Sequence, residues 1–419
     1  MNRRHFLGGA AAAAGLVGLP RRARASAGDR KFVFVFNQGG WDPTRVFAPE
    51  YANANVAMEA NGAAATAGGI SYVDHPNRPS VRSFLDAYHG RALVLNGMLV
   101  RAISHDLCTV LAMTGKTTGS SPDWPSLLAA SRADKYVLPH LVIGGPSYSG
   151  TYGALVSRTG AAGQLEGLLS GSLSTDASDI SVPRTDGLSI SAIDLALADN
   201  IAARLARAGA GVDGTLASDF QLATEKALAL RRAHDEMSFA TDDTFSSQAA
   251  VAADALSLGF SRCVSLAYPS DPFAVAWDSH GENDSIQSPL WEGLFAGLNE
   301  LMAALEAAPG DSGGSLADET IVVVLSEMGR TPALNGQDGK DHWPYTSAML
   351  VGRGFTGDRV VGAYDAYYNG SPVDPLTGEL SEGGEVPSSE MLGSTILALG
   401  DVDPEPYALG ASVLEGVLE

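Results

Sequence analysis

The sequence predicts an α/β protein, a three-layer α/β/α sandwich built around a mostly parallel mixed sheet. Short runs of β-branched and aromatic residues alternate along the chain with segments of helical periodicity. The strand-like runs are mostly apolar instead of alternating with polar residues, which is typical of strands that helices cover on both faces. Hydrophobic residues make up 45% of the chain and charged residues 18%, and this composition argues against disorder and against a coiled coil.

The first predicted strand covers residues 31–37 (KFVFVFN) and ends in a glycine loop, QGGWD, at residues 38–42. Because parallel strands need long crossover connections, strands that alternate with helices favour a sheet wound with helices on both faces. Further strands are predicted at residues 92–95, 141–143, 263–268, 273–277, 321–325 and 348–351, and helices at 107–113, 124–131, 290–307 and 390–399.

The middle of the chain, residues 157–260, is rich in alanine, glycine, serine and leucine. Helical periodicity covers residues 193–208 and 219–237 within it. We interpret this segment as a helical insertion or cap within a single domain of residues 28–419. It contains a G-x-G-x-x-G match at residues 209–214, but the match follows a helix instead of a strand, so no dinucleotide site is predicted there.

The first 27 residues have the pattern of an export signal. Arg3 and Arg4 precede an apolar stretch of 14 residues, from Phe6 to Leu19, and an Ala-Ser-Ala sequence follows at residues 25–27. The apolar stretch is shorter than the about 20 residues that span a bilayer. We therefore predict a twin-arginine signal peptide at residues 1–27 and a mature protein that is periplasmic or secreted.

The predicted mature chain is strongly acidic. Removal of residues 1–27 takes away five arginines and no acidic residues, so the net charge falls from −21 to −26, which makes nucleic acid a poor partner. No later apolar run is long enough for an integral membrane span, and no sequence feature determines the oligomeric state. The two cysteines, Cys108 and Cys263, either pair after export or remain as two buried thiols.

Carboxylate and imidazole side chains gather after four of the predicted strands. Because the carboxyl ends of parallel strands meet at one edge of an open sheet, we expect these side chains to lie close together. Oxygen and neutral nitrogen donors suit one or two divalent ions of zinc, manganese or calcium. The alternative is that each is a loop residue with ordinary turn and cap hydrogen bonds. The residues are Asp42, then Ser104, His105 and Asp106, then Asp278, His280, Glu282 and Asp284, and then Ser326, Glu327, Arg330, Asp338, Asp341 and His342.

Several motifs together resemble the family of exported proteins grouped as domain of unknown function 1501. The most specific pair is SEMGRTP at residues 326–332 with DHWP at residues 341–344. The resemblance covers nearly the whole mature chain. The other motifs that fit it are GGWD at 39–42, Ser104-His105 before a helix that ends in Met-Thr-Gly at 113–115, DSH at 278–280 and the closing helix at 389–400.

That family is similar to the alkaline phosphatase and sulfatase superfamily. The resemblance implies an alkaline phosphatase-like mixed sheet between helix layers, with a divalent metal site at strand ends. In that superfamily the metal ligands are a carboxylate after the first strand, an Asp and His pair for one ion, residues of a loop after a central strand and a histidine late in the chain. The metal ligands that it implies are Asp42, Asp278, His280, Glu327, Asp341 and His342.

Ser104 and His105 occupy the position where the resemblance to sulfatases implies the nucleophile. A serine at a helix N-terminus can attack phosphorus or sulfur while helix amides bind the anion, or Ser104 is an ordinary N-cap. His105 is a ligand, an acid or base, a phosphate-binding group or a structural histidine. Arg330 is expected to bind substrate oxygens through its guanidinium, with a surface salt bridge as the alternative.

Four further aromatic and basic residues carry weaker expectations. Trp41 and Trp343 flank the first-strand loop and the late histidine, and they either wall the pocket or pack in the core. Lys340 and His140 have no spacing that indicates a site, and we interpret both as structural.

The sequence favours an exported, metal-dependent hydrolase of phosphate or sulfate esters whose substrate is a small-molecule or polysaccharide ester. Ser104 or a water would attack, while Arg330 and the helix amides would stabilise the developing charge. A second hypothesis is a non-catalytic envelope protein that retains the fold and binds a partner or a polysaccharide. Met328, which follows Glu327 where a second donor is expected, favours this hypothesis. A third is a metal-free esterase that uses Ser104 and His105.

Overall fold

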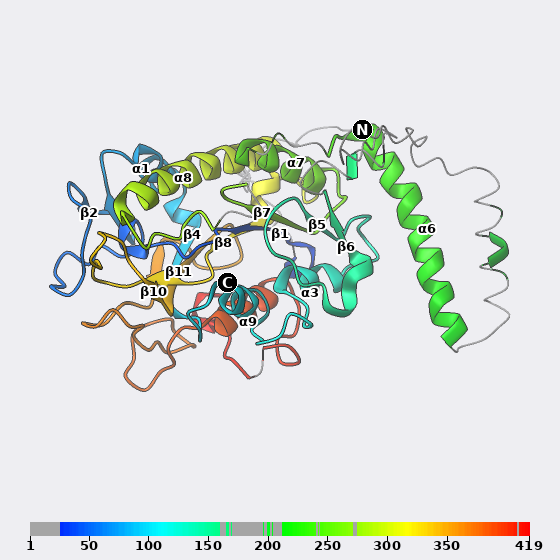
Figure 1. The fold of residues 1–419 in the computed structure, drawn as a ribbon. Coiled ribbons are helices and arrows are strands. Elements are labelled where there is room, and N and C mark those ends of the chain that lie inside the picture. Colours follow the sequence, from blue (N-terminus) through cyan, green and yellow to red (C-terminus); the bar gives the residue numbers. More distant parts are fainter. Residues whose placement is uncertain are drawn as a thin grey trace, which may run out of the picture.

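The computed structural model describes residues 26–159, 165–166, 169, 196, 199–201, 203, 212–239, 242, 244–270, 275–408 and 410–419. In these residues an eight-stranded mixed sheet, ordered β12-β4-β11-β8-β1-β7-β5-β6, lies between two layers of helices (Figure 1). The strands are β1 (Lys31–Phe36), β4 (Ala92–Leu99), β5 (His140–Val142), β6 (Val156–Arg158), β7 (Cys263–Ala267), β8 (Thr320–Leu325), β11 (Tyr345–Val351) and β12 (Arg359–Val361).

Helices cover both faces of the sheet. One layer contains α1 (Pro79–Tyr88), α7 (Phe245–Ser257) and α8 (Asn283–Ala307), and the other contains α2 (His105–Thr114), α3 (Trp124–Ala130) and α9 (Ser389–Leu399). Every side chain of β1 is buried. Because side chains alternate along a strand, Phe32 and Phe34 face the layer of α2 while Val33 and Val35 face the layer of α8. The predicted three-layer α/β fold is confirmed.

All but one of the eight strands run in the same direction. The exception is β11, which pairs antiparallel with both β4 and β8. The carboxyl ends of β1, β4, β7 and β8 therefore meet at one edge, which is where ligand sites form in open α/β sheets. Two small hairpins lie outside the main sheet: β2 (Ala63–Ala67) pairs with β3 (Ile70–Asp74), and β9 (Gly329–Arg330) pairs with β10 (His342–Trp343).

The predicted strand at residues 273–277 is wrong for the residues that the structure describes. Val275 is irregular and Ala276 and Trp277 lie in a turn, while residues 271–274 are outside the described part. Trp277 is buried against Trp41 and Trp291. Its apolar character therefore reflects packing of a turn against α8 and not a place in the sheet. The other six predicted strands are present at β1, β4, β5, β7, β8 and β11.

The insertion predicted at residues 157–260 has narrower bounds in the structure. At its start, β6 pairs with β5 as the last strand of the sheet. At its end, α7 buries Ala252 and Leu256 in the core between the sheet and α8. Between them, α6 (Val212–Glu236) confirms the helix predicted at residues 219–237 and stands apart from the two layers at the β6 end (Figure 1). Most of the helix predicted at residues 193–208 lies outside the described residues.

Two further expectations concern the chain ends and the cysteines. Residues 1–25 lie outside the described part, so the signal peptide stays a prediction. Among the described helices, none has the length and apolar character needed to cross a membrane.

Cys108 and Cys263 are both free and buried, and burial raises the pKa of each thiol to about 12. Of the two alternatives, the structure therefore shows two buried, unreactive thiols.

Candidate metal centre

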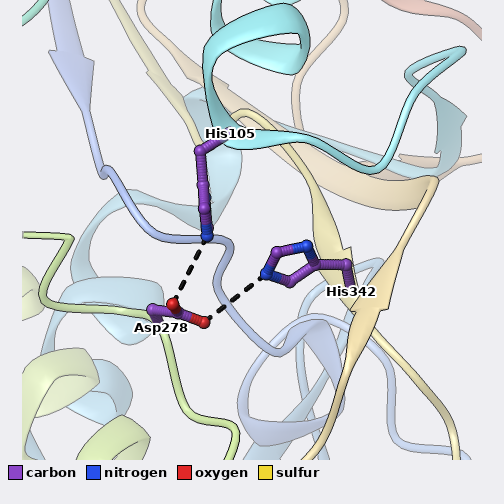
Figure 2. A group of neighbouring side chains, drawn as sticks. All are labelled: His105, Asp278 and His342. Atoms are coloured by element: carbon purple, nitrogen blue, oxygen red, sulfur yellow. Dashed lines mark ion pairs between the residues drawn. The ribbon is translucent and has the colours of Figure 1, made fainter.

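Three donor side chains from separate segments meet at the carboxyl edge of the sheet (Figure 2). His105 is the first residue of α2, which follows β4. Asp278 lies in the segment between β7 and α8, and His342 lies on β10. One ligand atom from each of these residues lies within 4.8 Å of the other two. We call these three residues, two histidines and one aspartate, the imidazole group.

His280 extends this group toward solvent. Its Nε2 lies 3.0 Å from His342 Nε2 and 3.2 Å from Asp278 Oδ1. Asp278 also lies near the other two rings, with Oδ2 3.4 Å from His105 Nε2 and Oδ1 3.6 Å from His342 Nε2. The Nε2 atoms of three histidines are therefore gathered around one carboxylate.

The opposite nitrogen of each ring has an acceptor of its own. Nδ1 of His105 lies 2.8 Å from Glu327 Oε1, Nδ1 of His342 lies 2.7 Å from the Ile103 carbonyl oxygen, and Nδ1 of His280 lies 2.9 Å from Asp341 Oδ1. For His105 and His342 these acceptors favour the tautomer with the proton on Nδ1, which leaves Nε2 as an acceptor, and His280 Nε2 lies within hydrogen-bond distance of His342 Nε2. His105 Nε2 is buried and makes no hydrogen bond within the described residues.

The ionisation of the group suits a metal ion. Burial lowers the pKa of His342, which favours a neutral imidazole. Burial opposes ionisation of Asp278, but the hydrogen bond and charge of Arg330 outweigh it and lower the pKa of that carboxyl. The hydrogen bond to Glu327 raises the pKa of His105, because the buried carboxylate stabilises the imidazolium. A cation bound at Nε2 would take the place of that proton.

Glu327 lies behind His105 and is not one of the three residues of the imidazole group; its role as a ligand stays a prediction. It follows β8 and is fully buried. Its Oε1 accepts hydrogen bonds from the Gly39 amide at 2.8 Å and from His105 Nδ1, and its Oε2 accepts one from Ser326 Oγ at 3.0 Å. Gly39 has φ +121, and a Cβ there would lie 2.6 Å from the Asp278 amide nitrogen, so only glycine fits this approach.

Arg330 is buried, and its guanidinium is occupied by backbone carbonyls. Nε donates to Gly40 O at 2.8 Å, and Nη1 donates to Lys340 O at 3.1 Å. Nη2 donates to Asp278 Oδ1 at 2.7 Å and also to the Gly39 carbonyl. The burial of Arg330 does not fit the predicted contact with a substrate anion. Arg330 instead fixes the loop after β1 and orients Asp278.

Asp42 is also not one of the residues of the imidazole group, and its role as a ligand stays a prediction. It is fully buried, and its Oδ2 lies 2.9 Å from Lys340 Nζ and 3.5 Å from Arg45 Nη1. Burial opposes its ionisation, but Lys340 and Arg45 lower the pKa of the carboxyl far below its usual value. Sequence reasoning missed this pairing, although Lys340 stands only two residues before His342.

Ser104 is exposed immediately before His105. It occupies the N-cap position of α2, but its side chain makes no capping hydrogen bond. Its hydroxyl is therefore not committed to the helix.

Asp341 is exposed and contacts His280, so it supports a neighbour of the group instead of joining it. Trp41 packs in the core against Trp291, as one of its two expectations proposed.

Several solved structures have a chain path with some similarity to this one. Ps i-CgsB in complex with k-i-k-neocarrahexaose is 8% identical, with a TM-score of 0.38 over 92% of this chain and 75% of that one. A protein in the alkaline phosphatase superfamily from Vibrio parahaemolyticus is 10% identical, with a TM-score of 0.38 over 92% and 68%. The PsFucS1 sulfatase from Pseudoalteromonas sp. is 12% identical, with a TM-score of 0.37 over 93% and 74%.

These TM-scores are too low to carry an argument, so the fold assignment rests on the strands and helices described above. No curated protein sequence matches the chain. A family model described as "Protein of unknown function (DUF1501)" matches residues 29–377. Because that match covers most of the sequence, the chain belongs to the DUF1501 family.

Proposed function

We propose that this protein is an exported, metal-dependent hydrolase of phosphate or sulfate esters in which His105, Asp278 and His342 hold a divalent ion. The observation that carries the proposal is the orientation of the imidazole rings of His105 and His342. Each ring has an acceptor at Nδ1 and turns Nε2 toward Asp278. This is how histidine ligands are oriented by the residues behind them in metal proteins.

The donor set favours zinc or manganese. Two of the three donors are imidazole nitrogens and the third is a carboxylate oxygen. Calcium takes six to eight oxygen ligands, whereas zinc and manganese accept this mixture. Three protein ligands are also what catalytic zinc sites use, because a further position must stay open for water or substrate.

The residues around the group have chemical roles that fit ester hydrolysis. When bound, the ion would supply positive charge that acidifies a water and stabilises a developing anion. Ser104 presents an exposed hydroxyl beside His105 that can attack phosphorus or sulfur; its proton passes to solvent as the bond from phosphorus or sulfur to the alcohol oxygen breaks. His280 is half-exposed and backed by Asp341, so it can hold a proton at Nε2 and pass it to the departing alcohol oxygen. Water then hydrolyses the serine ester.

One observation favours the second candidate, a non-catalytic envelope protein that retains the fold and the metal site and binds a partner or a polysaccharide. The guanidinium of Arg330, the expected anion contact, is buried against backbone carbonyls. A protein that only binds a partner has no need of such a contact. This candidate and the hydrolase share the ion and differ in turnover, so metal content and ester hydrolysis must be measured together.

The test uses the mature protein purified folded and without chelator. Elemental mass spectrometry should find zinc or manganese in the wild type and none in His105→Ala or Asp278→Ala. His89→Ala is the matched control, because His89 pairs with Asp358 at 2.8 Å on the exposed surface. Phosphate and sulfate esters of nitrophenol then test turnover, which Ser104→Ala should abolish. Bound metal without hydrolysis would favour the binding protein, and a folded protein without metal would contradict the metal-dependent hydrolase.

A further inference from the structure

A second buried carboxylate lies at the same edge of the sheet as the imidazole group. Asp42 follows β1 in the glycine loop, and its side chain has no exposed surface. The loop also provides the Gly39 amide, which donates to Glu327, the residue behind His105. Asp42 is therefore linked to the candidate metal ligands, and a two-ion site would be expected to use it.

The contacts of Asp42 leave no oxygen lone pair for an ion. Oδ1 accepts hydrogen bonds from the Thr44 amide at 3.1 Å and from Thr44 Oγ1 at 2.6 Å. Oδ2 accepts one from Asn283 Nδ2 at 3.0 Å and lies 2.9 Å from Lys340 Nζ and 3.5 Å from Arg45 Nη1. A carboxylate has about four lone-pair directions, and these donors fill them.

The charges around Asp42 are balanced without a metal. Lys340 is fully buried, and among the described residues its ammonium pairs with oxygen atoms of Asp42 and Thr44. Arg45 divides its guanidinium between Asp42 and Asp284, which lies 2.5 Å from Nη2. A divalent ion beside Asp42 would meet two buried cations within a few ångströms, and in a medium of low dielectric this repulsion is large.

We infer that Lys340 fills the position of a second cation, so that the site binds one divalent ion and Asp42 is not a ligand. This inference rests on the proposed function and specifies the metal site further. Lys340 then has a positioning role. Its ammonium holds Asp42, its carbonyl accepts a hydrogen bond from Arg330, and its amide donates to Ser279 O at 2.9 Å. These contacts fix the loops on which the imidazole group depends.

The first experiment is a zinc titration of the metal-free, full-length mature protein, followed by native mass spectrometry. We expect one ion per chain at saturation. Two ions per chain would overturn the inference while leaving the proposed metal site intact. No ion in a folded protein would overturn the inference together with the proposed metal site.

The second experiment uses the double variant Asp42→Asn with Lys340→Met, which removes both charges together and leaves the cluster without an unpaired lysine. We expect one ion per chain, with an affinity that falls by no more than the about tenfold typical of a contact behind a ligand. Loss of the ion from the variant, with circular dichroism like that of the wild type, would overturn the inference. If the variant does not fold, the wild-type stoichiometry decides alone.

Discussion

The two charged clusters at the carboxyl edge of the sheet are built in opposite ways. In the first, Asp42 is buried and neutralised by Lys340 and Arg45, and all of its oxygens have donors. In the second, His105, Asp278 and His342 are partly exposed, and His105 Nε2 makes no hydrogen bond within the described part of the chain. The first cluster is complete within the protein, whereas the second has donor atoms available for a cation.

The surroundings of Asp42 and Asp278 distinguish a structural carboxylate from a candidate metal ligand. Both Asp42 and Asp278 follow strands, and both are ionised beside a buried arginine or lysine. The two carboxylates differ in the other side chains that surround them. Hydrogen-bond donors and two cations occupy both oxygens of Asp42, whereas Asp278 has one cation, Arg330, and the Nε2 atoms of three histidines around it. A cluster that has more metal-binding nitrogen and oxygen atoms than cations to pair with them is the better candidate for a metal site.

The largest effect should come from breaking the Asp42 pair on one side only. Lys340→Met leaves a buried carboxylate with a single, more distant cation, and loss of one partner of a buried pair costs about 3–5 kcal/mol of unfolding free energy. Urea unfolding measures this change. Lys135→Met is the control, since Lys135 and Asp29 form an exposed pair that should contribute less than about 1 kcal/mol. Equal effects of the two variants would show that burial does not distinguish the first cluster.

A smaller effect on stability, conditional on metal, is expected at the second cluster. At a zinc concentration of about 100 times Kd, binding stabilises a folded protein by about 2.7 kcal/mol. We therefore expect zinc to raise the Tm of the wild type and of His89→Ala but not the Tm of Asp278→Ala. Differential scanning calorimetry with and without chelator measures the shift. An equal zinc-induced shift in Asp278→Ala would exclude Asp278 as a ligand.

Glu327→Gln tests the connection between the two clusters. Glutamine keeps an oxygen that can accept from His105 Nδ1 and the Gly39 amide but removes the negative charge. We expect one ion per chain with an affinity reduced by about tenfold, as for other residues behind metal ligands. A change in stoichiometry instead of affinity would indicate that Glu327 binds the ion directly, as the sequence predicted.

The smallest effect on the metal is expected at His140, a buried imidazole outside the site. Both of its nitrogens have hydroxyl partners, Ser126 Oγ at 3.2 Å and Ser265 Oγ at 2.8 Å, and burial lowers its pKa to about 3. The unfolded chain therefore binds more protons than the folded one between pH 3 and 6.5, and stability falls as the pH falls through this window.

His140→Gln should reduce that loss of stability, by at most about 1.4 kcal/mol per pH unit, and leave the zinc content at the wild-type value. Urea unfolding at several pH values between 4 and 6.5 measures the slope. An unchanged slope would mean that His140 is not the group that titrates, and a loss of zinc would extend the metal site beyond the second cluster.

Much of the fold could be predicted from the sequence because its signals are local. Within the run at residues 31–37, residues 32–36 are all apolar, and this pattern is typical of a strand covered on both faces. The predicted strand at residues 273–277 failed because Trp277 is buried in a turn, and periodicity cannot tell a buried turn from a short strand.

The candidate site could be predicted only in part. The position of His105 after β4 identified it, since the topology brings the carboxyl ends of β1, β4, β7 and β8 together. Asp278 and His342 were identified from their residue types and spacing, although the strand predicted before Asp278 is absent and His342 lies on the small hairpin of β9 and β10. The pairing of Asp42 with Lys340 depends on how the segment after β9 folds back onto the loop after β1, and no spacing in the sequence encodes that contact. The same holds for Arg330, whose guanidinium could reach either solvent or the backbone carbonyls that it contacts.

Anomalous X-ray scattering from crystals of the zinc-loaded protein tests the contrast between the two clusters most directly. We expect one zinc peak per chain, about 2.0–2.1 Å from His105 Nε2 and from His342 Nε2, with Asp278 as a third ligand. We expect no peak beside Asp42. A peak at Asp42, or the absence of zinc between His105 and His342, would show that the imidazole group is not the single metal site.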